Sequence, residues 1–466
     1  METTLEQKMR REFEEVLFKY SSEILVSDGA PGEHMESSII SRLPENISQA
    51  DLYKPRMVSI GPYYHSDNYN SHKWRFLESF LSRSSESLVN YIEEVVSLKR
   101  DARKCYSANF SLDQFEFVEM LLLDGCFILE LFFKWLNEDP DVLFTESWGL
   151  RMILSDLLLI ENQIPFFVIE RLFHKVMAGE AKNRRNAFLN LLARFLMNDQ
   201  EPSHTSLEIW PEKIYHLLHL YHYFLIVPNL SQEGKKEGEK YEQTTSPLWK
   251  QRLTEWSLDP TAQRPTQWSP TADQWGAKRP PRQIPGAVEL YEAGVKFKRN
   301  SSFKNLFDVK FGRGILEIPP LQIDSIKKII LANLVALERD KSWGDHTVTS
   351  YAALMDSLIN TKEDVTLLQH AGVIHNKLSS HQEAAVFFNQ LGDYFSIDNV
   401  NPYFVELFKN VQLYYDSSWN QSRARLMHDY FSSPWAIISV IAGVILLSLT
   451  IVQTFFTVYP YYRPSS

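Results

Sequence analysis

The sequence predicts a mainly α-helical fold: a helical bundle body with a small antiparallel β-sheet and one C-terminal transmembrane helix. Three observations predict it. From Ser71 to about Val227, apolar residues recur at three- and four-residue spacing and glycine is scarce. Short alternating segments between Gly294 and Ile318 predict the sheet. An almost uninterrupted apolar run over residues 435–458 predicts the membrane helix.

The composition is that of a folded protein. Of 466 residues, 44% are apolar and 23% are charged, and 58 acidic against 48 basic side chains give a net charge of -10. This negative charge argues against a nucleic-acid partner. Two cysteines, Cys105 and Cys126, are too few for a disulfide framework or a zinc site, so both are expected to be reduced and buried. We expect no cofactor.

The N-terminal part divides into a helical extension, 1–40, and a first helical half, 41–228. The extension is highly charged at its start and contains no signal-peptide core. The most apolar segment of the first half, 115–136, carries five charged side chains, so it is expected to be a core helix with Glu130 and Lys134 paired on its solvated edge. In the next apolar segment, 156–173, Pro165 is expected to kink or restart the helix.

Three polar residues lie inside these apolar segments: Asp124, Glu161 and Asn162. An unpaired polar group would be costly there, so each needs a partner. The structural interpretation is a buried hydrogen-bonded network that joins two core helices. The functional alternative is a carboxylate pair for general acid and base catalysis. Neither segment supplies a nucleophile, a metal site or a neighbouring histidine, so the sequence favours the structural interpretation and we assign no catalytic residue.

Histidines form two further groups. His216, His219 and His222 are three residues apart on a predicted helix and fan over about 120° of its surface, so one metal ion would reach at most two of them. We therefore assign no metal site and expect ordinary, partly exposed side chains. His65, His72 and Lys73 lie near the Gly61–Pro62 turn, where a solvated loop face is favoured over a cationic pocket.

Residues 229–285 differ in character from the rest of the chain. A charged run, EGKKEGEKYE, precedes a proline-rich stretch in which tryptophan recurs, and this composition predicts a disordered insertion without its own core. Trp256, Trp268 and Trp275 are candidate partner contacts, because aromatic anchors often dominate binding. A tolerated loop expansion is the alternative.

The C-terminal half, 286–432, is expected to contain the small sheet followed by helices. Residues 294–298, 308–311 and 315–318 alternate apolar and polar side chains, and Gly312-Arg313-Gly314 between the last two predicts a hairpin. Helices are then predicted over 323–338, 351–360, 364–370 and 382–391, the last with a capping box from Ser380 and Glu383.

The apolar run from Trp435 to Val458 is the predicted membrane anchor. At about 1.5 Å per residue it would reach roughly 36 Å, more than the hydrocarbon core of about 30 Å, and aromatic residues lie at both ends. Only the short tail 459–466 follows. The sequence therefore predicts a single-pass, tail-anchored protein of the plasma membrane or endomembranes, with lipid as a partner. A weak excess of positive charge on the body side predicts a cytosolic body.

Eight segments, in this order, closely resemble the plant family known as domain of unknown function 247, or the UPF0481 proteins. They are VSIGPYYH (58–65), HKWRFL (72–77), LLLDGCFILELF (121–132), DLLLIENQIPFFVIERLF (156–173), AGVKFK (293–298), LEIPPLQID (316–324), TSYAALMDSLI (349–359) and SSPWAIIS (432–439). The resemblance covers nearly the whole chain and implies a plant protein with a helical body and a C-terminal membrane segment.

The resemblance implies no activity, cofactor or catalytic residue. Some members lie at grass self-incompatibility loci and are thought to act as recognition determinants. The leading hypothesis is thus a membrane-anchored, non-enzymatic recognition or signalling protein with an unknown protein partner. The alternatives are a membrane-tethered enzyme that uses buried carboxylates, and a structural scaffold. The oligomeric state stays open.

Overall fold

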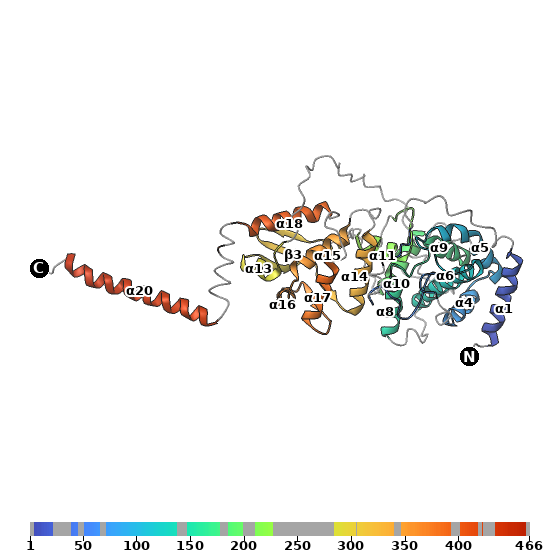
Figure 1. Ribbon diagram of the computed structural model, residues 1–466, viewed down its shortest axis with the longest axis horizontal. Helices are drawn as coiled ribbons and strands as arrows, with labels where there is room; N and C mark the ends of the chain where they lie inside the picture. Colours follow the sequence, from blue (N-terminus) through green and yellow to red (C-terminus); the bar gives the residue numbers. More distant parts are fainter. Residues whose placement is uncertain are drawn as a thin grey trace, which may run out of the picture.

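The computed structural model describes residues 4–21, 39–44, 51–65, 71–137, 147–177, 185–198, 210–226, 284–303, 305–339, 346–392, 401–417, 422 and 434–462. The body is mainly helical, as predicted, and its buried apolar side chains form one continuous core. Figure 1 shows the N-terminal helices at one end of the body and the C-terminal helices at the other, with α8, α11 and α14 between them.

The N-terminal end is built around one central helix, α6 (Gln114–Leu136), which packs against α4, α5, α9 and α10. It begins with the capping box that Asp113 and Glu116 form, which satisfies main-chain N–H groups of its first turn. Nearly every side chain beyond its first turn is buried. The other helices of this end are α1 (Thr4–Lys19), α4 (Ser71–Arg83), α5 (Leu88–Lys104), α8 (Ser147–Asp156), α9 (Phe166–Val176), α10 (Arg185–Leu196) and α11 (Leu217–Ile226).

Two local predictions for this end have different outcomes. Pro165 does restart the helix, since α9 begins directly after it. The predicted solvated edge of α6 is wrong, because the Glu130 carboxylate is fully buried. It accepts hydrogen bonds from Ser79 Oγ at 2.5 Å and Arg83 Nε at 2.8 Å, while Lys134 Nζ lies 4.0 Å away. Cys105 and Cys126 are free and buried, as predicted.

The C-terminal end contains two small sheets. β1 (Lys296–Arg299), β2 (Lys310–Gly312) and β3 (Ile315–Ile318) form a sheet in the order β1-β3-β2, and β4 (Leu321–Ile323) pairs with β5 (Ile374–Asn376). β2 and β3 make the predicted antiparallel hairpin. The expectation of a purely antiparallel sheet is wrong, because β1 pairs with the far edge of β3 in a parallel register and β4 with β5 is parallel too.

In the part of the body that the structure describes, six helices accompany these sheets. α13 (Ala287–Glu292) precedes β1 and packs against α16 (Lys362–His370). α14 (Ser325–Glu338) joins the two ends of the body through contacts with α8 and α11. The others are α15 (Thr347–Leu358), α17 (His381–Gly392) and α18 (Pro402–Tyr415).

The prediction of a C-terminal transmembrane helix is wrong. Among the residues that the structure describes, no helix combines the length and the apolar character that a membrane crossing requires. The helix at the predicted position is α20 (Pro434–Tyr462). The predicted single-pass membrane location is corrected with it; the side chains of Trp435 and Val458 lie outside the described residues.

Candidate functional site

The segment 51–65 has no regular secondary structure, and buried side chains from other elements bind its main chain. Asp156, the last residue of α8, accepts three of these bonds on one oxygen. Its Oδ2 lies 3.0, 2.6 and 3.0 Å from the main-chain nitrogens of Arg56, Met57 and Val58. Burial raises the pKa of Asp156 to about 6, although the three N–H donors act in the opposite direction.

Asn162 continues this arrangement along the same segment. Its Oδ1 accepts a hydrogen bond from the N–H of Ile60 at 2.7 Å, and its Nδ2 donates to the carbonyls of Val58 and Asp156 at 3.1 and 2.9 Å. The side chain is fully buried, and its amide bonds to main chain on both sides. Asn162 therefore joins the 51–65 segment to the turn after α8.

Glu161 connects the end of the 51–65 segment to residue Leu43, which precedes the segment. Its Oε1 accepts from the N–H of Leu43 at 2.5 Å and its Oε2 accepts from the Tyr64 hydroxyl at 2.7 Å. Both carboxylate oxygens are thus engaged by this chain itself. A carboxylate in this position is buried and already hydrogen-bonded, which favours a structural role over proton transfer to a substrate.

Asp124 belongs to the same network but reaches it from α6. Its Oδ2 accepts from the N–H of Gly61 at 2.7 Å, and its Oδ1 forms an ion pair with Lys73 Nζ. Both side chains are nearly inaccessible, with exposed fractions of 1% and 2%. Lys73 also donates to the carbonyl of Ser59 at 2.6 Å, so the pair closes a second connection to the 51–65 segment.

Sequence reasoning missed three members of this network. Lys73 was expected on a solvated loop face, but it lies on the apolar face of α4 with Leu77 and Phe80, at helical spacing that the sequence displays. Asp156 and Gln163 lie within or beside the apolar run that contains Glu161. Gln163 Nε2 donates to the carbonyls of Leu157 and Leu159, which are close to it in sequence. Gln163 could therefore have been recognised as a buried polar residue from the local sequence alone.

The network also reaches the C-terminal end of the body. Asn333 of α14 accepts from the N–H of Ile160 at 2.9 Å and donates to the carbonyl of Leu52 at 2.9 Å. Each of these buried amides and carboxylates bonds to main chain of a distant segment. The arrangement can therefore fix the 51–65 segment against α6, α8 and α14, and this is the role that its geometry favours.

The three histidines at the start of α11 and within it have separate partners. His222 Nε2 lies 2.6 Å from Glu338 Oε1, and Glu338 also accepts from the N–H groups of Val348 and Thr349. Burial raises the pKa of Glu338, but His222 and the N–H of Thr349 outweigh it and hold the pKa below its ordinary value. Among the described residues, no group of histidine, cysteine and carboxylate side chains could hold a metal ion.

His216 and His219 bind the main chain at the start of α11. His216 Nδ1 accepts from the N–H of His219 at 3.2 Å, and His219 Nδ1 accepts from the N–H of Tyr215 at 3.1 Å. The expectation of partly exposed histidines is wrong for His216 and His222, whose exposed fractions are 1% and 4%. The cause is that α11 lies between α10 and α14, which cover its sides.

We expect these buried histidines to make the protein less stable as the pH falls from 7 to 5. Burial lowers the pKa of His219 to about 3 and the pKa of His216 well below its ordinary value. The unfolded chain takes up these protons near pH 6.5, so the free energy of unfolding falls by about 1.4 kcal/mol per pH unit for each histidine. Between about pH 6 and 4, Asp156 offsets the destabilising effect of one histidine. Its raised pKa lets the folded state bind a proton before the unfolded state does, which stabilises the folded state as the pH falls.

Urea unfolding of the wild type and of His216→Asn at several pH values between 7 and 5 tests this. Asparagine keeps a side-chain acceptor for the N–H of His219 but does not titrate. In the variant, the free energy of unfolding should fall less steeply with falling pH, by about 1.4 kcal/mol per pH unit, the contribution of one histidine. An unchanged slope would show that His216 is not held neutral by burial.

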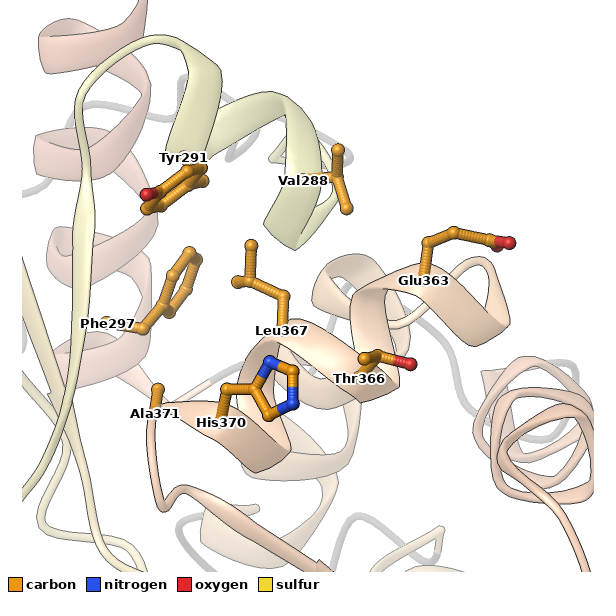
Figure 2. Close-up of a pocket in the computed structure, with 8 residues that line it drawn as sticks. All are labelled: Val288, Tyr291, Phe297, Glu363, Thr366, Leu367, His370 and Ala371. Atoms are coloured by element: carbon orange, nitrogen blue, oxygen red, sulfur yellow. The ribbon is translucent and has the colours of Figure 1, made fainter. Parts of the chain in front are cut away.

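A groove in the C-terminal half is a surface feature with a binding character. Its volume is about 510 Å³, it opens to solvent, and its lining is mostly apolar. Figure 2 shows α13 above it, β1 on one side and α16 below. The lining residues are Val288, Tyr291, Phe297, Glu363, Thr366, Leu367, His370 and Ala371.

Aromatic and aliphatic side chains converge in this groove. In Figure 2, Leu367 points up from α16 between Phe297 and Val288, and Tyr291 lies over Phe297. Tyr291 is 52% exposed, although it contributes to an apolar wall. His370 supplies a polar group at the bottom of the groove. An apolar pocket with a few polar groups is typical of a binding site.

The predicted partner contacts Trp256, Trp268 and Trp275 lie outside the described residues, as does nearly all of the predicted insertion 229–285. The sequence did not indicate the groove, because its lining combines the neighbouring elements α13 and β1 with α16, which lies about 65 residues further along the chain. Phe297 is apolar within the otherwise basic strand KFKR, and Leu367 is apolar on α16. These two residues were the only signal in the sequence that the strand and the helix contact something further.

Comparison with known proteins agrees with the resemblance. A family model described as a plant protein of unknown function, DUF247, matches residues 40–449. The UPF0481 protein At3g47200 of Arabidopsis thaliana is 31% identical over 442 residues, which cover 90% of this chain and 86% of that protein. The putative UPF0481 protein At3g02645, also from Arabidopsis thaliana, is 24% identical over 473 residues, covering 88% of each. No solved structure matches. The chain belongs to the DUF247, or UPF0481, family of plant proteins of unknown function.

Proposed function

We propose that this chain is a non-enzymatic recognition protein that binds another protein through the groove between α13, β1 and α16. The observation that carries this proposal is the open groove of about 510 Å³ with its apolar lining. Aromatic residues at the centre of an interface commonly supply most of its binding energy, and Tyr291 and Phe297 are placed to do so.

The buried carboxylates support a function without catalysis. Asp124, Asp156 and Glu161 each accept hydrogen bonds from main-chain N–H groups, and each is buried. A general acid or base must come within hydrogen-bond reach of a substrate. Substrate could approach these groups only if the 51–65 segment moved, which favours recognition over the enzyme alternative.

The insertion 229–285 remains part of this proposal as a variable contact region. It ends directly before Gly286, and α13 of the groove begins at the next residue. A partner that enters the groove would therefore lie near the point where the insertion rejoins the body. Deletion of residues 229–283 in an otherwise complete chain tests this part separately, since unchanged capture of every partner would remove the insertion from the contact surface.

Leu367→Glu is expected to abolish partner binding through the groove. The substitution places a charge among Phe297, Val288 and Tyr291, and we expect affinity for the native partner to fall at least about tenfold. The measurement is quantitative capture of partners from plant extract by the tagged full chain, followed by titration of the purified partner.

Leu413→Glu is the matched control for this experiment. Leu413 lies on α18 and is 62% exposed, so it tests the same chemical change on another surface. Circular dichroism and thermal unfolding of both variants should show a folded body. If Leu367→Glu captures the same partners as the wild type and the control, the groove is not the recognition site.

A further inference from the structure

β1 leaves one of its edges available for pairing. It is an outer strand of the sheet β1-β3-β2 and pairs with β3 in a parallel register. The N–H groups of Lys296 and Asn300 donate to the carbonyls of Gly314 and Ile318 at 2.8 and 2.9 Å. Because a strand uses every second residue for one neighbour, the peptide groups of Phe297 and Arg299 point away from β3.

These outward peptide groups have no main-chain partner in the part of the chain that the structure describes. Unpaired N–H and C=O groups along an exposed edge are a template for another strand. Phe297 is half-buried and Arg299 is exposed, so this edge is reachable from solvent. Strand addition to such an edge is a recurrent mode of peptide recognition.

The groove lies beside the same residue. Figure 2 shows the Phe297 side chain entering the groove opposite Leu367 and Val288. Successive side chains of a strand point to opposite faces, so an added strand would direct every second side chain toward the groove. The backbone edge and the apolar wall can therefore act on one extended peptide.

The positive charge of β1 favours an acidic peptide. Three of its four residues are basic: Lys296, Lys298 and Arg299. Lys298 Nζ lies 3.3 Å from Glu317 Oε1, which satisfies it, while Lys296 and Arg299 form no ion pair with any residue that the structure describes. Arg299 shares its face of the strand with Phe297. An acidic side chain two residues from an apolar one would meet this pattern.

We propose that the occupant of the groove is an extended, acidic peptide segment of a partner protein, which adds to the free edge of β1 as a fourth strand. One apolar side chain fills the groove beside Phe297 and Leu367, and a carboxylate pairs with Arg299. This inference rests on the proposed function and names its partner class and binding mode.

The first test selects peptides without assuming a sequence. A displayed library of random heptapeptides is panned against the full chain, and binders that also bind the Leu367→Glu variant are removed. We expect the remaining peptides to alternate apolar and other residues and to be enriched in Asp and Glu. Basic or uncharged groove-dependent peptides would overturn the acidic partner class.

The second test uses the best selected peptide and distinguishes strand addition from side-chain binding alone. N-methyl groups are placed on alternate amides in two matched sets. The set that faces β1 should weaken binding at least about tenfold, and the other set should change it less than about twofold. Equal effects of the two sets would overturn strand addition while leaving the groove as the recognition site.

Hydrogen exchange on the complex provides an independent readout. The peptide should slow exchange of the Phe297 and Arg299 amides, whereas Lys296 and Lys298, which already face β3, should change little. A groove-dependent partner protein that leaves the Phe297 and Arg299 amides unprotected overturns the inference but not the proposed function. Failure of Leu367→Glu to affect the native partner overturns both.

Charge reversal completes the design. Arg299→Glu should weaken the acidic peptide at least about tenfold and should be partly compensated when lysine replaces the peptide's acidic residues. Lys409→Glu on α18 is the control, because it makes the same charge change on a 58% exposed side chain away from the groove. Equal effects of the two substitutions would show only long-range attraction and contradict the pairing with Arg299.

Discussion

Replacing Asp124 by alanine is expected to lower the free energy of unfolding by about 3–5 kcal/mol. The change leaves Lys73 as an uncompensated buried cation and removes the acceptor for the N–H of Gly61. Removal of one partner from a buried ion pair is among the most destabilising single substitutions. Urea unfolding followed by circular dichroism gives the value directly, and loss of folded protein at 37 °C would be an extreme form of the same result.

A double substitution separates the ion pair from the rest of the network. Lys73→Met alone should also destabilise, since it leaves the Asp124 carboxylate buried without its cation. Lys73→Met together with Asp124→Leu should recover much of this loss, because no charge then remains buried. If the double variant is as unstable as the sum of the single variants, the two charges do not interact in the folded protein.

The same variants bear on the enzyme alternative. An active-site carboxylate could be replaced with little loss of stability, while a member of the core network could not. If Asp124→Ala retains wild-type stability and partner binding, the structural role proposed for this network is wrong. Burial and main-chain contacts of Asp124 lead us to expect instability.

Much of the body could be predicted from local patterns. The apolar run that forms α6 and the glycine-flanked hairpin of β2 and β3 each depend on residues that are close in sequence. Asp124, Glu161 and Asn162 were recognisable because a polar residue in an apolar run must find a partner. Their partners were not recognisable, because the N–H groups of Gly61, Leu43 and Ile60 are far away along the chain.

Other features depend on contacts that no local pattern reports. β1 pairs with the edge of β3 that β2 leaves free, and no local pattern reports this pairing or its parallel direction. The groove requires α13 and α16 to pack together beside β1. The membrane prediction rested on the length, the apolar composition and the aromatic ends of 435–458, whereas the described helices do not meet the length and hydropathy of a span.

Gly61→Ala is the second substitution from which we expect a large effect. Gly61 has a φ of +76°, a left-handed conformation that side chains disfavour by about 1–2 kcal/mol. A Cβ atom there would also lie 2.3 Å from the carbonyl oxygen of Gln163, so the main chain would have to move. Overpacking of a core adds about 1–3 kcal/mol. We expect a total loss of about 2–5 kcal/mol in urea unfolding.

Gly125→Ala is the matched control, since it adds the same methyl group to the same core. Its Cβ would lie 2.4 Å from Leu172 Cδ1, but that atom is the end of a flexible side chain, and alanine favours a helix over glycine by about 1 kcal/mol. The carbonyl of Gln163 cannot yield in this way, because Tyr106 Oη donates to it and Gln163 Nε2 bonds to Leu157 and Leu159. Gly61→Ala should therefore be the less stable variant by at least about 1 kcal/mol. Equal stabilities would mean that the 51–65 segment adapts as easily as a side chain, and that the buried network does not hold it rigidly.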